Sequence, residues 1–111
     1  MSEEAFGAVV TTSPKGSVIA LTGTVNRAAK EGLEAAYAEA SRTEGSVLLD
    51  FGDVDYINST GIAVIVGILA IARSTDREIG ARGLTEHYRE VFEITRLSDF
   101  MNIYDDANAG N

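Results

Sequence analysis

Residues 46–73 read SVLLDFGDVDYINSTGIAVIVGILAIAR and contain the transition that decides the fold. The first part, residues 46–51, is a nearly continuous apolar run, which is typical of a strand covered on both faces. After the polar corner at residues 58–61, residues 62–72 carry no charge and favour an apolar helix that begins near Thr60. A buried strand that leads directly into such a helix predicts an α/β domain.

The N-terminal part of the chain predicts a hairpin and then a helix. Residues 8–12 and 17–25 are rich in β-branched side chains and flank the turn sequence Ser-Pro-Lys-Gly at residues 13–16. Residues 27–42 change to helical spacing, and Asn26 is the expected N-cap. The residues expected on the buried face of that helix are Ala29, Leu33, Ala36, Tyr37 and Ala40.

The C-terminal part adds a weak strand at residues 78–83, a helix and a last strand at residues 100–104. Thr85 can cap this helix, which should bury Tyr88, Val91 and Phe92. The order β-β-α-β-α-β-α-β predicts a single α/β domain over residues 1–111, with a mixed, mainly parallel sheet and helices packed against it. We expect an ordered core over about residues 6–105 and a flexible tail at 106–111.

Composition narrows the possible functions. The chain has 111 residues, of which 45% are hydrophobic, so it can build one core but not two. It has no cysteine, which excludes disulfides, thiolate catalysis and cysteine-ligated metals. Its net charge of −8 disfavours nucleic acid and anionic lipid as partners. The start MSEEAFGAVV lacks the basic residues of a signal peptide, and no apolar run reaches the roughly 20 residues of a membrane span, so we expect a soluble, cytoplasmic protein.

The residues that could act in catalysis lack the partners that known mechanisms need, so we expect a protein that is not an enzyme. The single histidine, His87, lies on a predicted surface helix between two glutamates. The sequence around Ser59 lacks the first glycine of a G-x-S-x-G nucleophile elbow, and no histidine is placed to act as its base. The glycines of residues 80–83 come without the lysine of a P-loop or the spacing of a dinucleotide fingerprint.

Three carboxylates before the helix permit two interpretations. Asp50, Asp53 and Asp55 are close in sequence and could hold a hard cation. Alternatively, Asp50 ends a strand and the other two lie on a solvated loop. We favour the second interpretation and predict no metal and no cofactor.

The polar corner can serve both as a helix cap and as a modification site. If Asn58 or Ser59 caps the helix, its side-chain oxygen accepts from a backbone N–H group that otherwise lacks a partner. The positive end of the helix dipole lies at the same place. A phosphate on Ser59 would therefore meet free N–H groups, and it would add roughly 1.5 to 2 negative charges without unfolding the domain.

The apolar helix after the corner predicts a second, unusual face. Ile62, Ile65, Val66 and Leu69 share one face that should pack on the sheet. Val64, Ile68 and Ile71 then fall together on the far side with Gly67 and Thr60, where a surface helix would carry charged side chains. That face is covered either by the third helix of the domain or by a docked partner.

At these residues the chain resembles a known family. The run VLLDFGDVDYINSTGIAVIVG at residues 47–67 is similar to the signature of STAS domains, the sulphate-transporter and anti-sigma-factor-antagonist family. LTGTVN at 21–26 resembles the second strand of the family and its following turn, and VFEITRL at 91–97 resembles its late leucine-rich helix ending. The resemblance covers almost the whole chain and implies the STAS fold.

In stand-alone members of this family, a serine is phosphorylated by the anti-sigma factor, which is itself a serine kinase. The resemblance implies that role for Ser59. The unphosphorylated antagonist binds the anti-sigma factor and frees the sigma factor, phosphorylation ends the binding, and a serine phosphatase restores it. We expect a monomer or weak dimer. The implied partner-binding residues are Asn26, Asp55, Tyr56, Asn58, Ser59, Thr60, Gly61, Val64 and Ile68.

Two positions depart from the family pattern. Asn58 stands where the family usually has Asp before the serine, and Gly-Thr-Val-Asn at residues 23–26 stands where it usually has Gly-Glu-Leu/Ile-Asp. Each change removes a carboxylate and leaves a hydrogen-bonding side chain. Two further interpretations stay open: a scaffold or sensor domain that does not switch, and a small-ligand or nucleotide binder that uses the helix N-terminus as an anion site.

Overall fold

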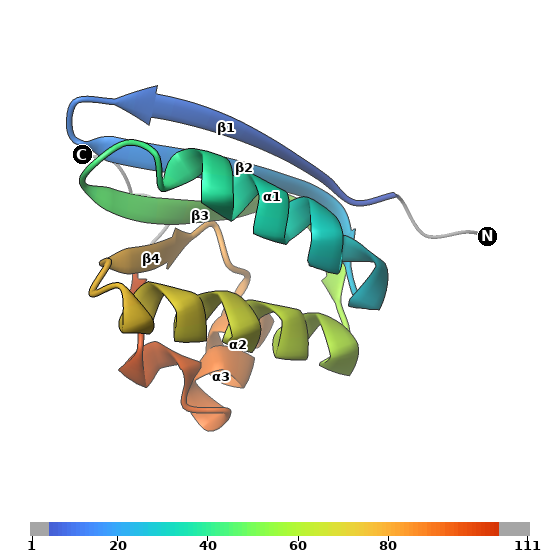
Figure 1. The fold of residues 1–111 in the computed structure, drawn as a ribbon. Coiled ribbons are helices and arrows are strands. Elements are labelled where there is room, and N and C mark those ends of the chain that lie inside the picture. Colours follow the sequence, from blue (N-terminus) through green and yellow to red (C-terminus); the bar gives the residue numbers. More distant parts are fainter. Residues whose placement is uncertain (1–4, 105–111) are drawn as a thin grey trace.

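The computed structural model describes residues 5–104 and alternates strands with helices in the predicted order (Figure 1). Short 3₁₀ turns, η1 (Arg27–Ala29) and η2 (Leu97–Asp99), precede α1 and β5 respectively. The remaining elements are β1 (Gly7–Ser13), β2 (Gly16–Val25), α1 (Lys30–Ala40), β3 (Ser46–Ile57), α2 (Ser59–Ser74), β4 (Ile79–Arg82), α3 (Glu86–Ile94) and β5 (Asn102–Ile103).

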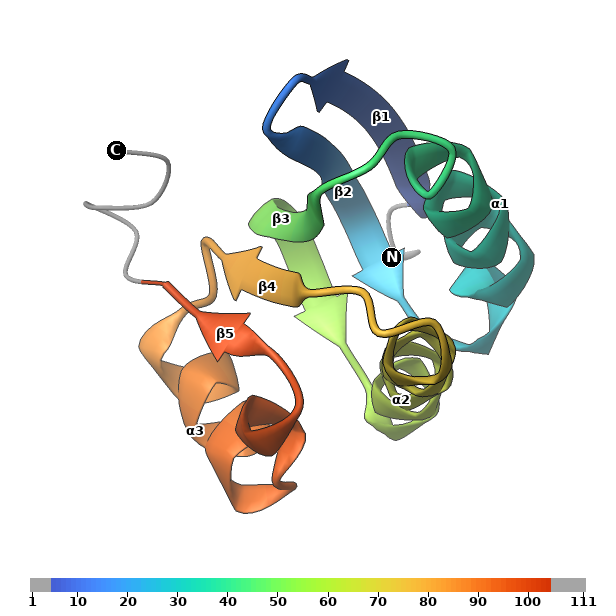
Figure 2. The ribbon, with the colours of Figure 1, turned by 60° about the vertical axis from the view of Figure 1, so that its left-hand side comes forward.

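The five strands of the described chain form one sheet in the order β1-β2-β3-β4-β5. The β1–β2 hairpin is antiparallel and all later pairs are parallel, which confirms the predicted mixed sheet. Each crossover steps to the next strand in the same direction. Since such crossovers are right-handed, they bring α1, α2 and α3 to the same face of the sheet (Figure 2).

The core lies between this face and the three helices. Ile19, Val47 and Leu49 are fully buried there, and Phe92 of α3 makes an edge-on contact with Phe51, with ring centroids 5.7 Å apart. On the opposite face Leu48 and Asp50, the alternate residues of β3, are only half-buried, and no described helix covers them. The prediction that residues 46–51 are covered on both faces is therefore wrong, because all three crossovers lie on one side.

β3 continues to Ile57, well beyond the strand end predicted at residue 51. Its pairing with β2 shifts register twice, once after Asp50 and again before Tyr56. Each shift places an extra residue on β3, and such bulges bend a strand and increase its twist. Asp50 thus lies inside the strand instead of ending it, and the bulged segment carries the chain to the start of α2.

The helices bury mostly the predicted residues, but α2 is turned. All five residues predicted for the buried face of the first helix are at most 6% exposed. In α3, Phe92 is buried and its two predicted companions are half-buried. In α2, Val66 is 47% exposed although it was predicted to face the sheet. The buried residues of α2 are Gly61, Val64, Ile65, Ile68, Leu69 and Ala72.

The C-terminal end of the described chain differs from the prediction in the length of its last strand. The last strand is shorter than predicted, since β5 covers only Asn102–Ile103. The predicted flexible tail, 106–111, lies outside the described residues. In the described part, no helix combines the length and the apolar character that a membrane crossing needs.

Candidate functional site

Asn58 caps α2. It has an extended backbone, with φ −100° and ψ −176°, and its Oδ1 accepts from the backbone N–H of Gly61 at 2.9 Å. The same oxygen accepts from the hydroxyl of Thr60 at 2.7 Å. The sequence left open whether Asn58 or Ser59 caps the helix. In the structure Asn58 is the N-cap, and the side chain of Ser59 does not take part in the cap.

Ser59 is the first residue of α2 and is exposed. The first N–H groups of a helix have no acceptor within the helix, and the Asn58 side chain accepts only that of Gly61 among them. Within residues 5–104 the N–H groups of Ser59 and Thr60 have no acceptor, and they lie at the positive end of the helix dipole. The Ser59 hydroxyl lies on the surface beside two backbone donors.

The corner is tied to the end of β2. The backbone N–H of Asn58 donates to the carbonyl oxygen of Val25 at 3.2 Å, and the hydroxyl oxygen of Thr60 accepts from the N–H of Arg27 at 3.0 Å. Asn26 is half-buried and its Oδ1 accepts from the N–H of Ala28 at 2.9 Å, which confirms Asn26 as a cap, here of η1. These bonds fix the helix start against the strand.

Gly61 lies where α2 approaches β2 most closely. A Cβ atom on this residue would be 2.0 Å from the carbonyl oxygen of Val25 and 2.6 Å from its carbonyl carbon. The position therefore requires glycine, and the residue is buried. The expectation that Gly61 contacts a partner is wrong, because the backbone of Val25 already occupies that side.

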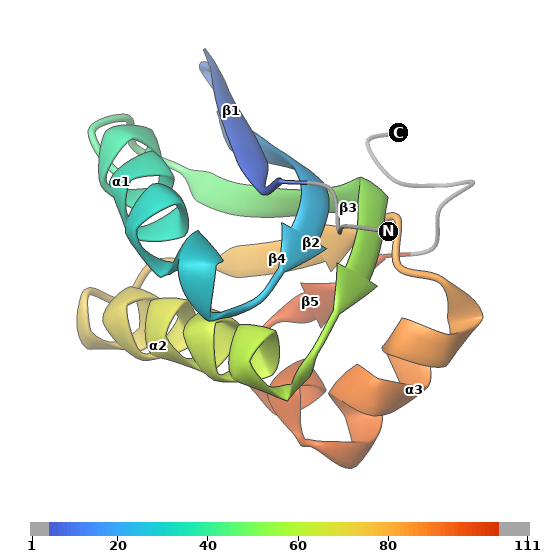
Figure 3. The ribbon, with the colours of Figure 1, turned by 90° about the vertical axis from the view of Figure 1, so that its right-hand side faces the viewer.

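The segment between β3 and α2 lies between helices α2 and α3 (Figure 3). The hydroxyl oxygen of Tyr88, on α3, accepts from the backbone N–H of Ile57 at 3.0 Å. A cavity of about 370 Å³ opens beside this bond. We call it the Ser59 groove; it is lined by Tyr56, Ile57, Asn58, Ser59, Ile62, His87, Tyr88, Val91 and Thr95.

The sequence did not reveal that α3 forms one wall of this groove. Tyr88 was predicted only as a buried residue, and no pattern indicated that its hydroxyl reaches the end of β3. His87 is exposed, as predicted for a surface helix, but it lies in the groove lining, with its ring centroid 4.9 Å from that of Tyr88. The arrangement brings α3 next to Ser59.

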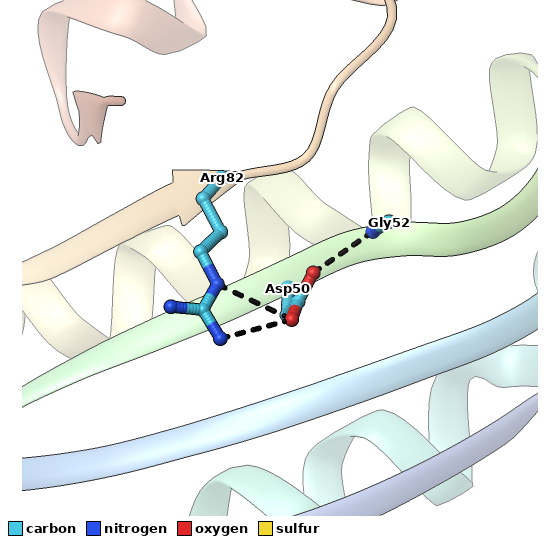
Figure 4. Close-up of polar contacts among 3 residues, drawn as sticks. All are labelled: Asp50, Gly52 and Arg82. Carbon is cyan, nitrogen blue, oxygen red and sulfur yellow. Dashed lines mark hydrogen bonds and ion pairs between the residues drawn. The ribbon is translucent and has the colours of Figure 1, made fainter. Parts of the chain in front are cut away.

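Asp50 forms an ion pair with Arg82 on the neighbouring strand. Its Oδ2 lies 3.1 Å from Nη2 of Arg82, and its Oδ1 accepts from the N–H of Gly52 at 2.9 Å (Figure 4). Asp53 and Asp55 are exposed near the corner. Among the described residues, no group of three His, Asp or Glu side chains is placed to hold a metal ion.

Two of the predicted partner-binding residues are buried. Val64 is 9% exposed and Ile68 is 1% exposed, so the prediction that they form a docking surface is wrong. The cover is α1 together with η1, which lie beside α2 on the same face of the sheet (Figure 1). It is not the third helix, which was the intramolecular alternative. Of the remaining predicted residues, Asn58 is half-buried, and Asp55, Tyr56, Ser59 and Thr60 are exposed.

Comparisons with known proteins agree on one family. The family model described as "Mlab, STAS domain" matches residues 8–103. The protein named "Putative anti-sigma factor antagonist BtrV" of Bordetella bronchiseptica is 41% identical over 93 residues, covering 83% of this chain and 78% of BtrV. The anti-sigma-B factor antagonist of Listeria monocytogenes is 41% identical over 61 residues, and the match spans only about half of each protein, 54%.

Solved structures share the fold. An anti-sigma factor antagonist from Mycobacterium paratuberculosis superposes with a TM-score of 0.72 at 16% identity, covering 90% of this chain and 86% of the other. The phosphorylated form of Bacillus SpoIIAA gives 0.67 at 19% identity, covering 95% and 96%. Identities this low show the fold alone. The match of the family model over residues 8–103 and the similarity to BtrV establish that this chain belongs to the STAS domain family.

Proposed function

We propose that this STAS domain is an anti-sigma factor antagonist that works by partner switching. In the unphosphorylated form it binds an anti-sigma factor and so frees a sigma factor; phosphorylation of Ser59 ends the binding. The observation that carries this proposal is the exposed Ser59 hydroxyl at the start of α2, which the cap leaves unused. The names of BtrV and of the Listeria relative support it.

The chemistry of the corner fits such a switch. A phosphate on Ser59 would lie beside the free N–H groups of Ser59 and Thr60 and the positive end of the helix dipole. The cap bond from Gly61 to Asn58 does not involve Ser59, so it can persist after modification. The fold stays intact while roughly 1.5 to 2 negative charges appear on an exposed surface. A partner that packs on Asp55 and Tyr56 would then face a changed charge.

In this proposal the chain is a substrate and a binding protein, not an enzyme. The anti-sigma factor is the serine kinase, and a serine phosphatase removes the phosphate again. Both act in the cytoplasm, where sigma factors work. Asn58, the residue before Ser59, carries no charge. The kinase therefore recognises the Ser59 hydroxyl without a carboxylate on the preceding residue.

The test uses the purified serine-kinase anti-sigma factors of the genome that encodes this chain. Each is mixed with the full chain and ATP, and mass spectrometry locates the phosphate. Binding is measured by calorimetry, and light scattering reports whether the chain is a monomer or weak dimer. We expect one phosphate, on Ser59, and tight binding of wild type and Ser59→Ala but not of Ser59→Asp.

Ser74→Asp is the matched control, since it adds the same charge to an exposed serine at the other end of α2. It should bind like wild type. Absence of any phosphate and of any complex with every kinase would contradict the proposal.

Two alternatives give different outcomes in the same assay. A scaffold domain that does not switch would bind its partner equally well with Ser59→Ala and Ser59→Asp. A small-anion or nucleotide binder is favoured by the free N–H groups beside the groove of about 370 Å³. It would gain thermal stability from nucleotide well above its dissociation constant, by up to about 3 kcal/mol at a hundredfold excess.

A further inference from the structure

β1 forms one edge of the sheet (Figure 1), and among the described strands only β2 pairs with it. The strand at the other edge, β5, has two residues, whereas β1 has seven. An edge strand presents a row of backbone N–H and C=O groups that can pair with a further strand. The outer side of β1 is therefore the longer unpaired edge of the described sheet.

β1 lacks the features with which natural proteins block pairing at such an edge, namely charged side chains, proline and bulges. Its sequence is GAVVTTS. Its pairing with β2 runs from the first residue to the last without a register shift, whereas the pairing of β2 with β3 shifts twice. Val9 pairs with Ala20 and lies on the face of the sheet that no described helix covers, where it is 64% exposed. The edge is thus regular, uncharged and open.

The charge distribution favours a second copy of the chain as the occupant of this edge. The chain has a net charge of −8, so two copies repel each other, but they can meet at β1 without bringing charges together in the strand. Antiparallel pairing sets the end of one β1 beside the start of the other. In the sequence Lys15 follows the strand, and Glu3 and Glu4 precede it, so this direction matches opposite charges at both ends.

α1 leaves room for a second copy beside β1. It contacts both β1 and β2, so its axis lies about 5 Å inward from the line along which two β1 strands would meet. The two copies of α1 would then be about 10 Å apart, a distance at which helices pack. On the side next to β1, α1 carries Gly32, whose Cβ would lie 3.2 Å from the ring of Phe6, and one turn later Ala35 and Ala36. Residues this small allow the two helices to approach.

We propose that the chain forms a symmetric dimer through antiparallel pairing of β1 with β1 of a second copy. The register that overlaps all seven residues places Val10 opposite Val10 of the second copy, and Val9 opposite Thr11. The five strands of each copy then join into one continuous sheet, and the assembly closes at two copies because β5 takes no part. One strand and one helix side per copy bury less than the roughly 800 Å² per partner of a standard interface, so the dimer is weak.

The first test measures self-association by sedimentation equilibrium of the full chain from about 10 µM to 1 mM. The mass of the wild type should rise from that of a monomer to that of a dimer and stop there. Val9→Lys should raise the dissociation constant of the dimer at least about tenfold, because the two lysines would lie on diagonal positions of the paired strands, about 7–8 Å apart. Circular dichroism checks that the variant stays folded.

Asn102→Lys is the matched control, since it adds the same charge to an exposed residue of β5, at the other edge. It should change the dissociation constant by less than about twofold. A wild-type chain that stays monomeric over the whole range would overturn the proposal and leave β1 to a strand of a different protein. Equal effects of the two lysines, or masses that grow beyond the dimer, would overturn it as well.

The second test uses the absence of cysteine from the chain, which removes any background of disulfide formation. Val10→Cys places one thiol of each copy at the two-fold axis, where opposite Cα atoms are about 4.5–5.5 Å apart and can be bridged. Val9→Cys is more exposed, but its diagonal Cα distance of about 7–8 Å is too long. Oxidation with diamide should therefore cross-link Val10→Cys at least about fivefold faster. Cross-linking that follows exposure instead, with Val9→Cys ahead, would contradict the dimer.

A mixture of two variants checks the register without touching the axis. Val9→Cys and Thr11→Cys are both at exposed positions and are opposite each other only between copies in this register. On non-reducing gels the mixed pair should form a heterodimer at least about fivefold faster than either variant forms a homodimer. Equal rates for the three combinations would show random collision.

These tests need no anti-sigma factor, so the inference and the proposed function can fail separately. The dimer uses β1 and α1, whereas partner switching uses the start of α2 at Ser59. If Ser59→Asp abolishes binding of an anti-sigma factor while the wild-type chain stays monomeric, partner switching stands and the dimer inference fails. If the chain dimerises through β1 but no anti-sigma factor binds or modifies it, the inference stands and the proposed function fails.

Discussion

Asp50 and Arg82 join β3 to β4 through two hydrogen bonds to one carboxylate oxygen. Oδ2 of Asp50 accepts from Nε of Arg82 at 3.2 Å and from Nη2 at 3.1 Å (Figure 4). The other oxygen accepts from the N–H of Gly52 at 2.9 Å, where the first register shift of β3 begins. One carboxylate thus holds the neighbouring strand and the start of the bulged segment that leads to Ser59.

Asp50→Asn tests the strength of this connection. The amide oxygen can still accept from Gly52, but the charge that compensates Arg82 is lost. Both side chains are 27% exposed, so solvent screens part of the interaction, and we expect a loss of about 1 to 2 kcal/mol in the free energy of unfolding. Urea denaturation measures it. Asp99→Asn, at the exposed pair with Arg96, is the control and should change stability little; equal losses would show that the Asp50 pair is no more than a surface contact.

Asn58 gives a prediction about the cap. Asn58→Ala removes the acceptor for Gly61 N–H and for the Thr60 hydroxyl, and should cost about 1 kcal/mol. Asn58→Asp keeps both acceptors and adds a negative charge at the positive end of α2, which contributes about 0.3 to 1 kcal/mol. Thermal unfolding near neutral pH should therefore rank Asp at or above wild type and both above Ala. If Asp proves as destabilising as Ala, the cap geometry is incorrect.

Arg77 should be important for stability although it lies far from Ser59. Its Nη1 donates to the carbonyl oxygens of Thr43 and Gly45, each at 2.7 Å, and its Nη2 donates to that of Ser41 at 2.9 Å. A lysine cannot reproduce this planar fork, so Arg77→Lys should lower the free energy of unfolding by about 2 kcal/mol. Arg42→Lys, at an exposed position of the same loop, is the comparison in a denaturant series. A smaller effect at Arg77 than at Arg42 would contradict this interpretation.

The order of elements could be predicted because each boundary carries a local signal. Asn26, Asn58 and Thr85 all accept from a backbone N–H at the start of a helical segment, where the sequence placed caps. The end of β3 could not be predicted in the same way. The last part of β3 contains the polar residues Asp53 and Asp55, so the sequence pattern there is typical of a loop. In the structure two bulges allow these exposed residues to continue the strand.

The orientation of α2 was the least predictable feature of the site. Residues 62–72 are uncharged, so the apolar periodicity that normally distinguishes the inner face from the outer face is almost absent. Only the tertiary structure shows that Val64 and Ile68 pack inward while Val66 points out. For the same reason the sequence placed the docking surface on a face that α1 covers, and the wall that α3 contributes to the Ser59 groove was missed.

The two glycines of α2 offer the sharpest test of how the helix start is positioned. A Cβ at Gly61 would meet backbone atoms of Val25, with 2.0 Å to the carbonyl oxygen, and backbone cannot move aside as a flexible side chain can. Gly61→Ala should therefore push α2 away from β2 and cost about 1 to 3 kcal/mol or more. A Cβ at Gly67 meets nothing within 4 Å, and the residue is exposed in the middle of the helix, so Gly67→Ala should stabilise by about 0.5 to 1 kcal/mol. Glycine-to-alanine substitutions at two positions of one helix should thus change the free energy of unfolding in opposite directions. Calorimetric unfolding measures both changes directly. Because Asn58 and Ser59 move with the helix start, Gly61→Ala should also shift the amide resonances of the corner, whereas Gly67→Ala should leave them in place; stabilisation by both alanines would mean that α2 does not rest on Val25.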